Sequence, residues 1–85
     1  MAAHIYYTSI PFVRSADGRL ASVGAAEMTS YRAATIQARA TVGTLIGSNM
    51  VVGAVAVSRV RDVELAEELT LVLTRFGETP VLLIG

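Results

Sequence analysis

Hydrophobic and polar positions alternate along the first third of the chain, and this pattern predicts a β-hairpin. Residues 4–14 are rich in β-branched and aromatic residues, as is typical of a strand. Pro11 has no amide donor, so we expect it at a bulge or near the end of this strand. Residues 15–18 are typical of a turn. A weaker second strand follows over residues 20–29, with an interruption at Gly24.

The spacing becomes helical after Ser30, which we expect to cap a helix that starts at Tyr31. Small apolar residues recur three and four positions apart and predict the buried face of this helix. They are Ala33, Ile36, Ala40 and Gly43. We expect Gly47 to end the helix in a left-handed conformation. Because the predicted buried face is small, the helix can lie close to a sheet.

An apolar run of β-branched residues over 51–60 predicts a central strand that is covered on both faces. Residues 40–58 carry no charge, so a membrane-spanning helix is the alternative for this segment. A turn signature over residues 47–49 lies in its middle. The turn favours the strand over the membrane helix.

The pattern over residues 62–76 fits two structures. Apolar residues at helical spacing after Asp62 predict a helix, whereas the alternation of leucine with β-branched residues predicts a strand. We expect a helical turn over residues 63–68 and a strand over residues 69–76. Pro80 then separates this strand from four apolar residues, which are Val81, Leu82, Leu83 and Ile84.

Together these elements predict one α+β domain over residues 1–85, with an apolar C-terminal tail over residues 79–85. The fold is a small antiparallel sheet with one main helix, in the order β-β-α-β-β. A right-handed crossover through the helix places the third strand beside the first, so the strand order in space is 2-1-3-4. The helix covers one face and leaves apolar residues on the other, which favours a partner there.

The composition favours an interaction domain. Of the residues, 53% are hydrophobic and 16% are charged, against about 25% charged in a typical domain. A small domain with excess apolar surface commonly buries it in a partner, so we expect a homodimer or another protein partner. Seven arginines balance seven acidic residues, which disfavours nucleic acid and membranes as partners. No signal-peptide pattern is visible at the N-terminus, so we expect a cytoplasmic location.

Residue types that carry catalysis are scarce. The chain has no cysteine, no lysine and one histidine, His4, whereas a nucleophile needs a base and an orienting group. We therefore expect no enzymatic activity, no catalytic residue, no cofactor and no metal site. We assign Tyr6 and Tyr7 to packing. Arg59 and Arg61, at the exit of the third strand, are the candidates for contact with an anion or an acidic partner.

The apolar tail is the candidate interface between two subunits. Its residues are Val81, Leu82, Leu83 and Ile84. Left in water, an unpaired apolar strand is a template for another chain. We therefore expect the tail to pair with, or pack on, a second subunit.

Four stretches resemble a group of small uncharacterised proteins of GC-rich bacteria. They are Ile10-Pro11-Phe12-Val13, Ala16-Asp17-Gly18, Gly53-Ala54-Val55-Ala56-Val57-Ser58-Arg59 and Arg75-Phe76-Gly77-Glu78-Thr79-Pro80. The likeness covers most of the chain and implies a strand that ends at the Phe-Gly turn, but it implies no activity. The chain departs from the group at residues 63–68, where a Gly-containing loop is expected. A hairpin followed by a helix is also similar to antitoxins of the HicB type. That likeness implies the alternative function, a small regulatory nucleic-acid-binding protein.

Overall fold

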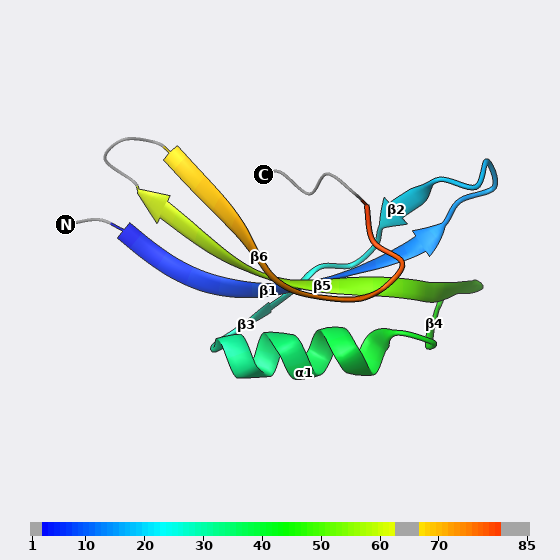
Figure 1. Cartoon of the computed structure of the whole chain (residues 1–85), viewed down its shortest axis with the longest axis horizontal. Coiled ribbons are helices and arrows are strands. Elements are labelled where there is room, and N and C mark those ends of the chain that lie inside the picture. Colours follow the sequence, from blue (N-terminus) through cyan, green and yellow to red (C-terminus); the bar gives the residue numbers. More distant parts are fainter. Residues whose placement is uncertain (1–2, 63–66, 81–85) are drawn as a thin grey trace.

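The computed structural model describes residues 3–62 and 67–80, and these form one helix and one antiparallel sheet of six strands (Figure 1). The long strands are β1 (Ala3–Arg14), β5 (Asn49–Asp62) and β6 (Glu67–Gly77). The short strands are β2 (Leu20–Ser22), β3 (Ala26–Met28) and β4 (Leu45–Ile46), and the helix is α1 (Tyr31–Thr41). The predicted α+β class is confirmed. The element order and the size of the sheet differ in detail from β-β-α-β-β.

β5 is the central strand of the sheet. It pairs with β1 on one side and with β6 on the other, antiparallel in both cases. Residues 53–57 are buried, which confirms the prediction of a covered central strand. The predicted second strand is divided into β2 and β3, which both pair with β1. The division lies at Gly24, where φ is +61°, so the expected interruption is confirmed.

Pro11 lies where its missing amide donor has little effect. The amide of Val23 donates to the Pro11 carbonyl oxygen at 2.9 Å, so the backbone polar groups of Pro11 face away from β5. They face residues 23–25, where the second strand is interrupted. A bulge follows one residue later, between Phe12 and Val13. The prediction that Pro11 lies at a bulge or near the end of its strand is therefore confirmed.

The start of α1 was predicted correctly, but its end was not. The Ser30 hydroxyl oxygen accepts a hydrogen bond from the Ala33 amide at 3.1 Å and caps the helix. The helix ends at Thr41, not at Gly47, which lies instead in the turn between β4 and β5 with φ +63°. The chain leaves the helix early because Gly43, two residues after its end, already donates to the carbonyl of Val51 in β5.

The predicted buried face of α1 is wrong. Ala34 and Ala38 are fully buried against two alanines of β5, Ala54 and Ala56. Ile36, which was expected to be buried, is 58% exposed. Four alanine side chains bring the helix close to the sheet and leave no room between them for isoleucine. The expected close approach of helix and sheet is consistent with this packing.

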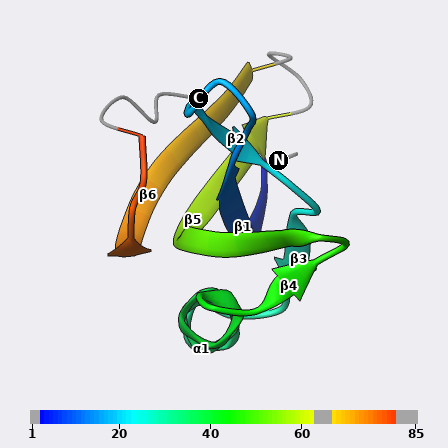
Figure 2. The same ribbon diagram turned by 90° about the vertical axis from the view of Figure 1, so that its right-hand side faces the viewer.

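The opposite face of the sheet is concave, because the long strands curve and β2 and β6 rise on either side of it (Figures 1 and 2). Ile10, Phe12, Val55 and Val57 are buried there, with Leu20 and Val72 packed against them. A second bulge, between Ala56 and Val57 in the pairing of β5 with β6, accompanies this curvature. The centre of this face is therefore buried within the chain, and the partner expected on this face stays a prediction.

The last third of the described chain is a strand. β6 begins at Glu67, so the strand predicted over residues 69–76 is confirmed and the helical alternative there is wrong. Glu67 and Glu68, expected in a helical turn, belong to β6, while residues 63–66 and the tail Val81–Ile84 lie outside the described residues. In the part that is described, no helix is long and apolar enough to cross a membrane.

Candidate interaction surface

Two rows of residues cross the sheet on the face that carries α1, which we call the helix face. The first row joins Ile5 of β1, Val60 of β5 and Leu69 of β6. In the next row, Leu71 of β6 lies opposite Ser58 of β5. Residues directly opposite one another in antiparallel strands share a face. Ile5, Val60, Leu69 and Leu71 therefore form one apolar ladder.

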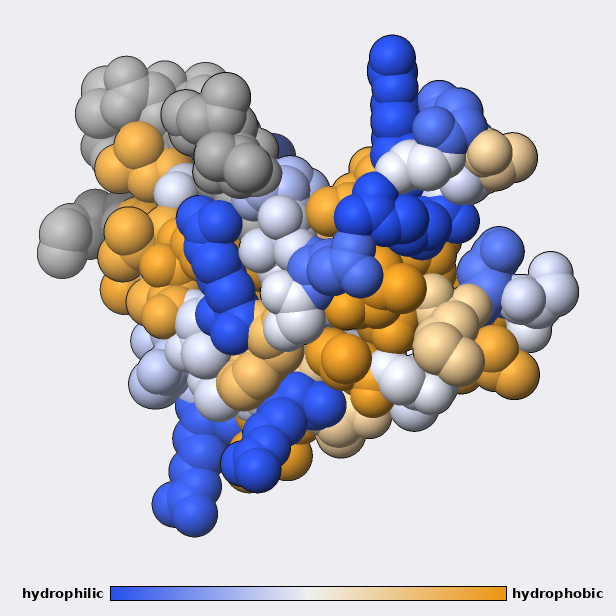
Figure 3. All heavy atoms as spheres, turned by 45° about the vertical axis from the view of Figure 1, so that its right-hand side comes forward, coloured by the Kyte–Doolittle hydropathy of each residue, from blue (hydrophilic) through white to orange (hydrophobic). Residues whose placement is uncertain are grey.

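The ladder is exposed because α1 covers only the part of the helix face next to it. The hydroxyl groups of Tyr31, at the start of α1, and of Thr74, in β6, lie 3.2 Å apart. Beyond this contact, Ile5 is 62% exposed, Leu69 is 69% exposed and Leu71 is 63% exposed. Figure 3 shows several groups of apolar residues on the surface, separated by charged and polar ones. Single exposed apolar residues are ordinary, but adjacent ones on neighbouring strands indicate an interaction site.

The ladder reaches an open edge of the sheet. β6 pairs with β5 along its inner edge, and no strand among residues 3–62 and 67–80 pairs with its outer edge. An open edge offers unpaired N–H and C=O groups to another strand. Exposed leucines and an open edge thus occur on the same strand.

A smaller exposed apolar group lies at the hairpin of β4 and β5. Leu45 is 66% exposed, Met50 is 57% exposed and Ile46 is 37% exposed. Leu45 and Met50 lie opposite one another. This group is carried by a strand of only two residues, so it offers no extended edge.

The two arginines predicted as contact residues lie on the concave face. Arg59 lies between Tyr6 of β1 and Thr70 of β6, and Arg61 lies opposite His4 of β1. The prediction that both arginines share one side is confirmed by their places on β5. The Arg59 Nε atom is buried and has no hydrogen-bond acceptor among the described residues. The proximity of Tyr6 and Arg59 was not predicted, because it depends on the strand register.

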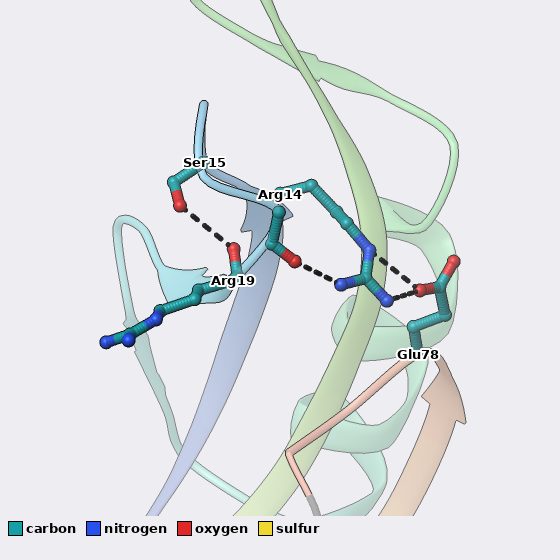
Figure 4. A network of polar contacts seen from close by, with 5 residues as sticks. Arg14, Ser15, Arg19 and Glu78 are labelled. Carbon is teal, nitrogen blue, oxygen red and sulfur yellow. Dashed lines mark hydrogen bonds and ion pairs between the residues drawn. The ribbon is translucent and has the colours of Figure 1, made fainter.

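Charged groups at the other end of the sheet have structural partners (Figure 4). Arg14 Nε donates to Glu78 Oε1 at 3.1 Å, which ties the end of β1 to the segment after β6. In the adjoining turn, hydrogen bonds from the Ser15 hydroxyl and the Arg19 amide lower the pKa of the Asp17 carboxyl below its usual value of 3.8. The turn predicted over residues 15–18 is confirmed. These contacts are exposed, so they contribute little to stability.

Metal and small-molecule sites need clustered ligands or a cavity. In the described ranges, no three or more histidine, aspartate or glutamate residues lie close enough to hold a metal ion. The same ranges enclose no cavity. Of the candidate contact residues, Arg59 and Arg61 are placed together, while Val81, Leu82, Leu83 and Ile84 lie outside the described residues.

Comparison with known proteins identifies no similar protein. The chain matches no protein-family model, and neither the curated proteins nor the solved structures contain a significant match. The resemblance to small proteins of GC-rich bacteria therefore stays a prediction.

Proposed function

We propose that this protein is a small, non-enzymatic interaction domain of the cytoplasm that associates with itself through the β6 side of the helix face. The observation that carries this proposal is the apolar ladder. Its residues Ile5, Leu69 and Leu71 are each more than three-fifths exposed, and the two leucines lie on β6, whose outer edge is open. A surface of this kind fits another polypeptide chain, because both its apolar side chains and its backbone groups need a partner.

The magnitudes support association of two copies. Full burial of a large aliphatic side chain is worth about 1.5–3 kcal/mol. Two copies of Leu69 and Leu71 would together gain at most about 6–12 kcal/mol. Association costs about 4–15 kcal/mol. Apolar burial and the cost of association are therefore similar in size, and hydrogen bonds along the open edge add to the favourable side.

Light scattering of the purified chain tests the proposal. We expect the wild type to have the mass of a dimer, and a variant with both Leu69→Ser and Leu71→Ser to have the mass of a monomer with a similar circular dichroism spectrum. Ile36→Ser is the matched control, because Ile36 is 58% exposed but lies on α1. We expect this control to remain a dimer. A wild type that is monomeric at high micromolar concentration would refute self-association.

The tail Val81–Ile84 remains the second proposed interface segment. Deleting residues 80–85 distinguishes the two segments in the same light-scattering experiment. If the deletion dissociates the dimer and the double leucine variant does not, the tail forms the interface and the ladder does not. If only the leucine variant dissociates it, the ladder alone is the interface.

A nucleic-acid-binding function is the alternative, and the proximity of Tyr6 and Arg59 on the concave face favours it. Aromatic and basic side chains on one sheet face are typical of proteins that stack bases. The chain has no net charge, which opposes this function because phosphate contacts dominate such binding. A gel-shift assay at low salt tests whether the protein binds nucleic acid. We expect no retardation at tens of micromolar protein, where even non-specific binding is normally visible.

A further inference from the structure

We propose that the partner is a second copy of this chain, bound edge to edge through β6, with the two-fold axis at Thr70. This inference rests on the proposed self-association and specifies its geometry. The two β6 strands would run antiparallel and join both sheets into one. Three features of β6 point to this geometry: the direction of its backbone groups, the place of its bulge, and the pattern of side chains about Thr70.

The backbone polar groups of Thr70 face the open edge. Pro11 directs its carbonyl away from β5, towards Val23, so its partner Ala54 is not hydrogen-bonded to β1. The backbone N–H and C=O groups of successive residues point to opposite edges of a strand. Arg59 lies five residues after Ala54, and the pairing of β5 with β1 has no register shift between them. Arg59 therefore directs its backbone groups to β1. Thr70 lies opposite Arg59, so its own N–H and C=O point outward.

An axis at Thr70 gives a hydrogen-bonded pair at the centre of the interface. Each Thr70 would donate its N–H to, and accept at its C=O from, the Thr70 of the partner subunit. In that register Leu69 lies opposite the partner subunit's Leu71, and the reverse pair forms on the other side of the axis. Both leucines belong to the apolar ladder, so the β6 ends of the two ladders would lie side by side on one face and cover each other.

The bulge limits the register. β6 begins at Glu67, and its pairing with β5 shifts where Leu73 has no partner. An axis at Thr70 pairs residue 67 with residue 73, so it uses the whole stretch from the start of the strand to the bulge. An axis at Val72 would carry the pairing through the bulge. An axis at Glu68 would leave a shorter pairing, because β6 begins only one residue before it.

Single cysteines test this geometry cleanly, because the chain has no cysteine of its own. Thr70→Cys should form a disulfide-linked dimer under mild oxidation. The Cα atoms of a hydrogen-bonded antiparallel pair lie about 5.5 Å apart, within the range that a disulfide spans. Ile36→Cys is the control for random collision. We expect Thr70→Cys to crosslink at least about tenfold faster, because a residue in the interface meets its partner at millimolar effective concentration.

A mixed crosslinking experiment fixes the register. Leu69→Cys mixed with Leu71→Cys should crosslink faster than either variant alone, because residue 69 faces residue 71 of the other subunit. If Leu71→Cys crosslinks fastest by itself, the axis lies at residue 71 and the proposed register is wrong. If no β6 variant crosslinks while light scattering still shows a dimer, the edge-to-edge geometry is wrong and self-association stands. A monomeric wild type refutes both.

Discussion

Two glycines determine how closely the end of β6 approaches β5. Gly53 and Gly77 lie opposite each other in the two strands. A Cβ atom on Gly53 would overlap the backbone of Glu78, and one on Gly77 would overlap the carbonyl of Val52. The Glu78 amide donates to that Val52 carbonyl at 2.9 Å. The absence of side chains at these two positions therefore permits the chain to bend over the concave face after β6.

Gly53→Ala should destabilise the protein. The added methyl group forces the backbone at Glu78 to move, and overpacking of this kind costs about 1–3 kcal/mol. Chemical denaturation measures the free energy of unfolding. The control Ser22→Ala, at an exposed strand position, should change this free energy by less than about 0.5 kcal/mol. A Gly53→Ala variant as stable as the control would contradict the close approach.

At the scale of elements, the packing of α1 on β5 depends on small residues in both. Ala34 and Ala38 contact the sheet, where Ala54 and Ala56 are fully buried. This is the part of the fold that the sequence predicted least well. Alanines and one isoleucine are spread around the helix, so spacing alone does not select the buried side, and the larger Ile36 points to the wrong one. Ser30, by contrast, forms its cap within one turn and was predicted from sequence alone.

Ala38→Leu should separate the helix from the sheet and lower the free energy of unfolding by about 1–3 kcal/mol. Ala40→Leu makes the same change at an exposed position of α1, and we expect an effect within about 0.5 kcal/mol. Thermal and chemical denaturation of both variants provide the measurement. Equal effects at the two positions would show that the buried face is not the one formed by Ala34 and Ala38.

At the scale of the whole molecule, strand positions were predicted well because each depends on local alternation and turn residues. Which residues become neighbours across the sheet was not predicted. The ladder needs the register that aligns Ile5 with Val60 and Val60 with Leu69, and alternation within one strand does not give the register between strands. Leu69 and Leu71 were therefore predicted as strand residues and not as an interface. The tail Val81–Ile84 is recognisable from the sequence as apolar, because four apolar residues in a row need no knowledge of the register.

Association through β6 predicts a concentration-dependent pattern of amide hydrogen exchange. Thr70 has an outward amide, so we expect its exchange to slow when the protein concentration rises from low to high micromolar. Leu69 and Leu71 direct their amides to β5, so these amides should be protected at both concentrations. Exchange followed residue by residue by NMR makes the comparison. Equal exchange of the Thr70 amide at both concentrations would contradict pairing at this edge.

The division of the second strand at Gly24 also bears on how far such an assembly grows. Once two copies share β6, the exposed margins of the joined sheet are those beyond β1. Short strands of three residues each, β2 and β3, line these margins at intervals. Short, interrupted margins are poor templates for adding a further chain. Along residues 7–14 of β1, the break at Gly24 therefore disfavours the addition of a further chain to this apolar, strand-rich protein.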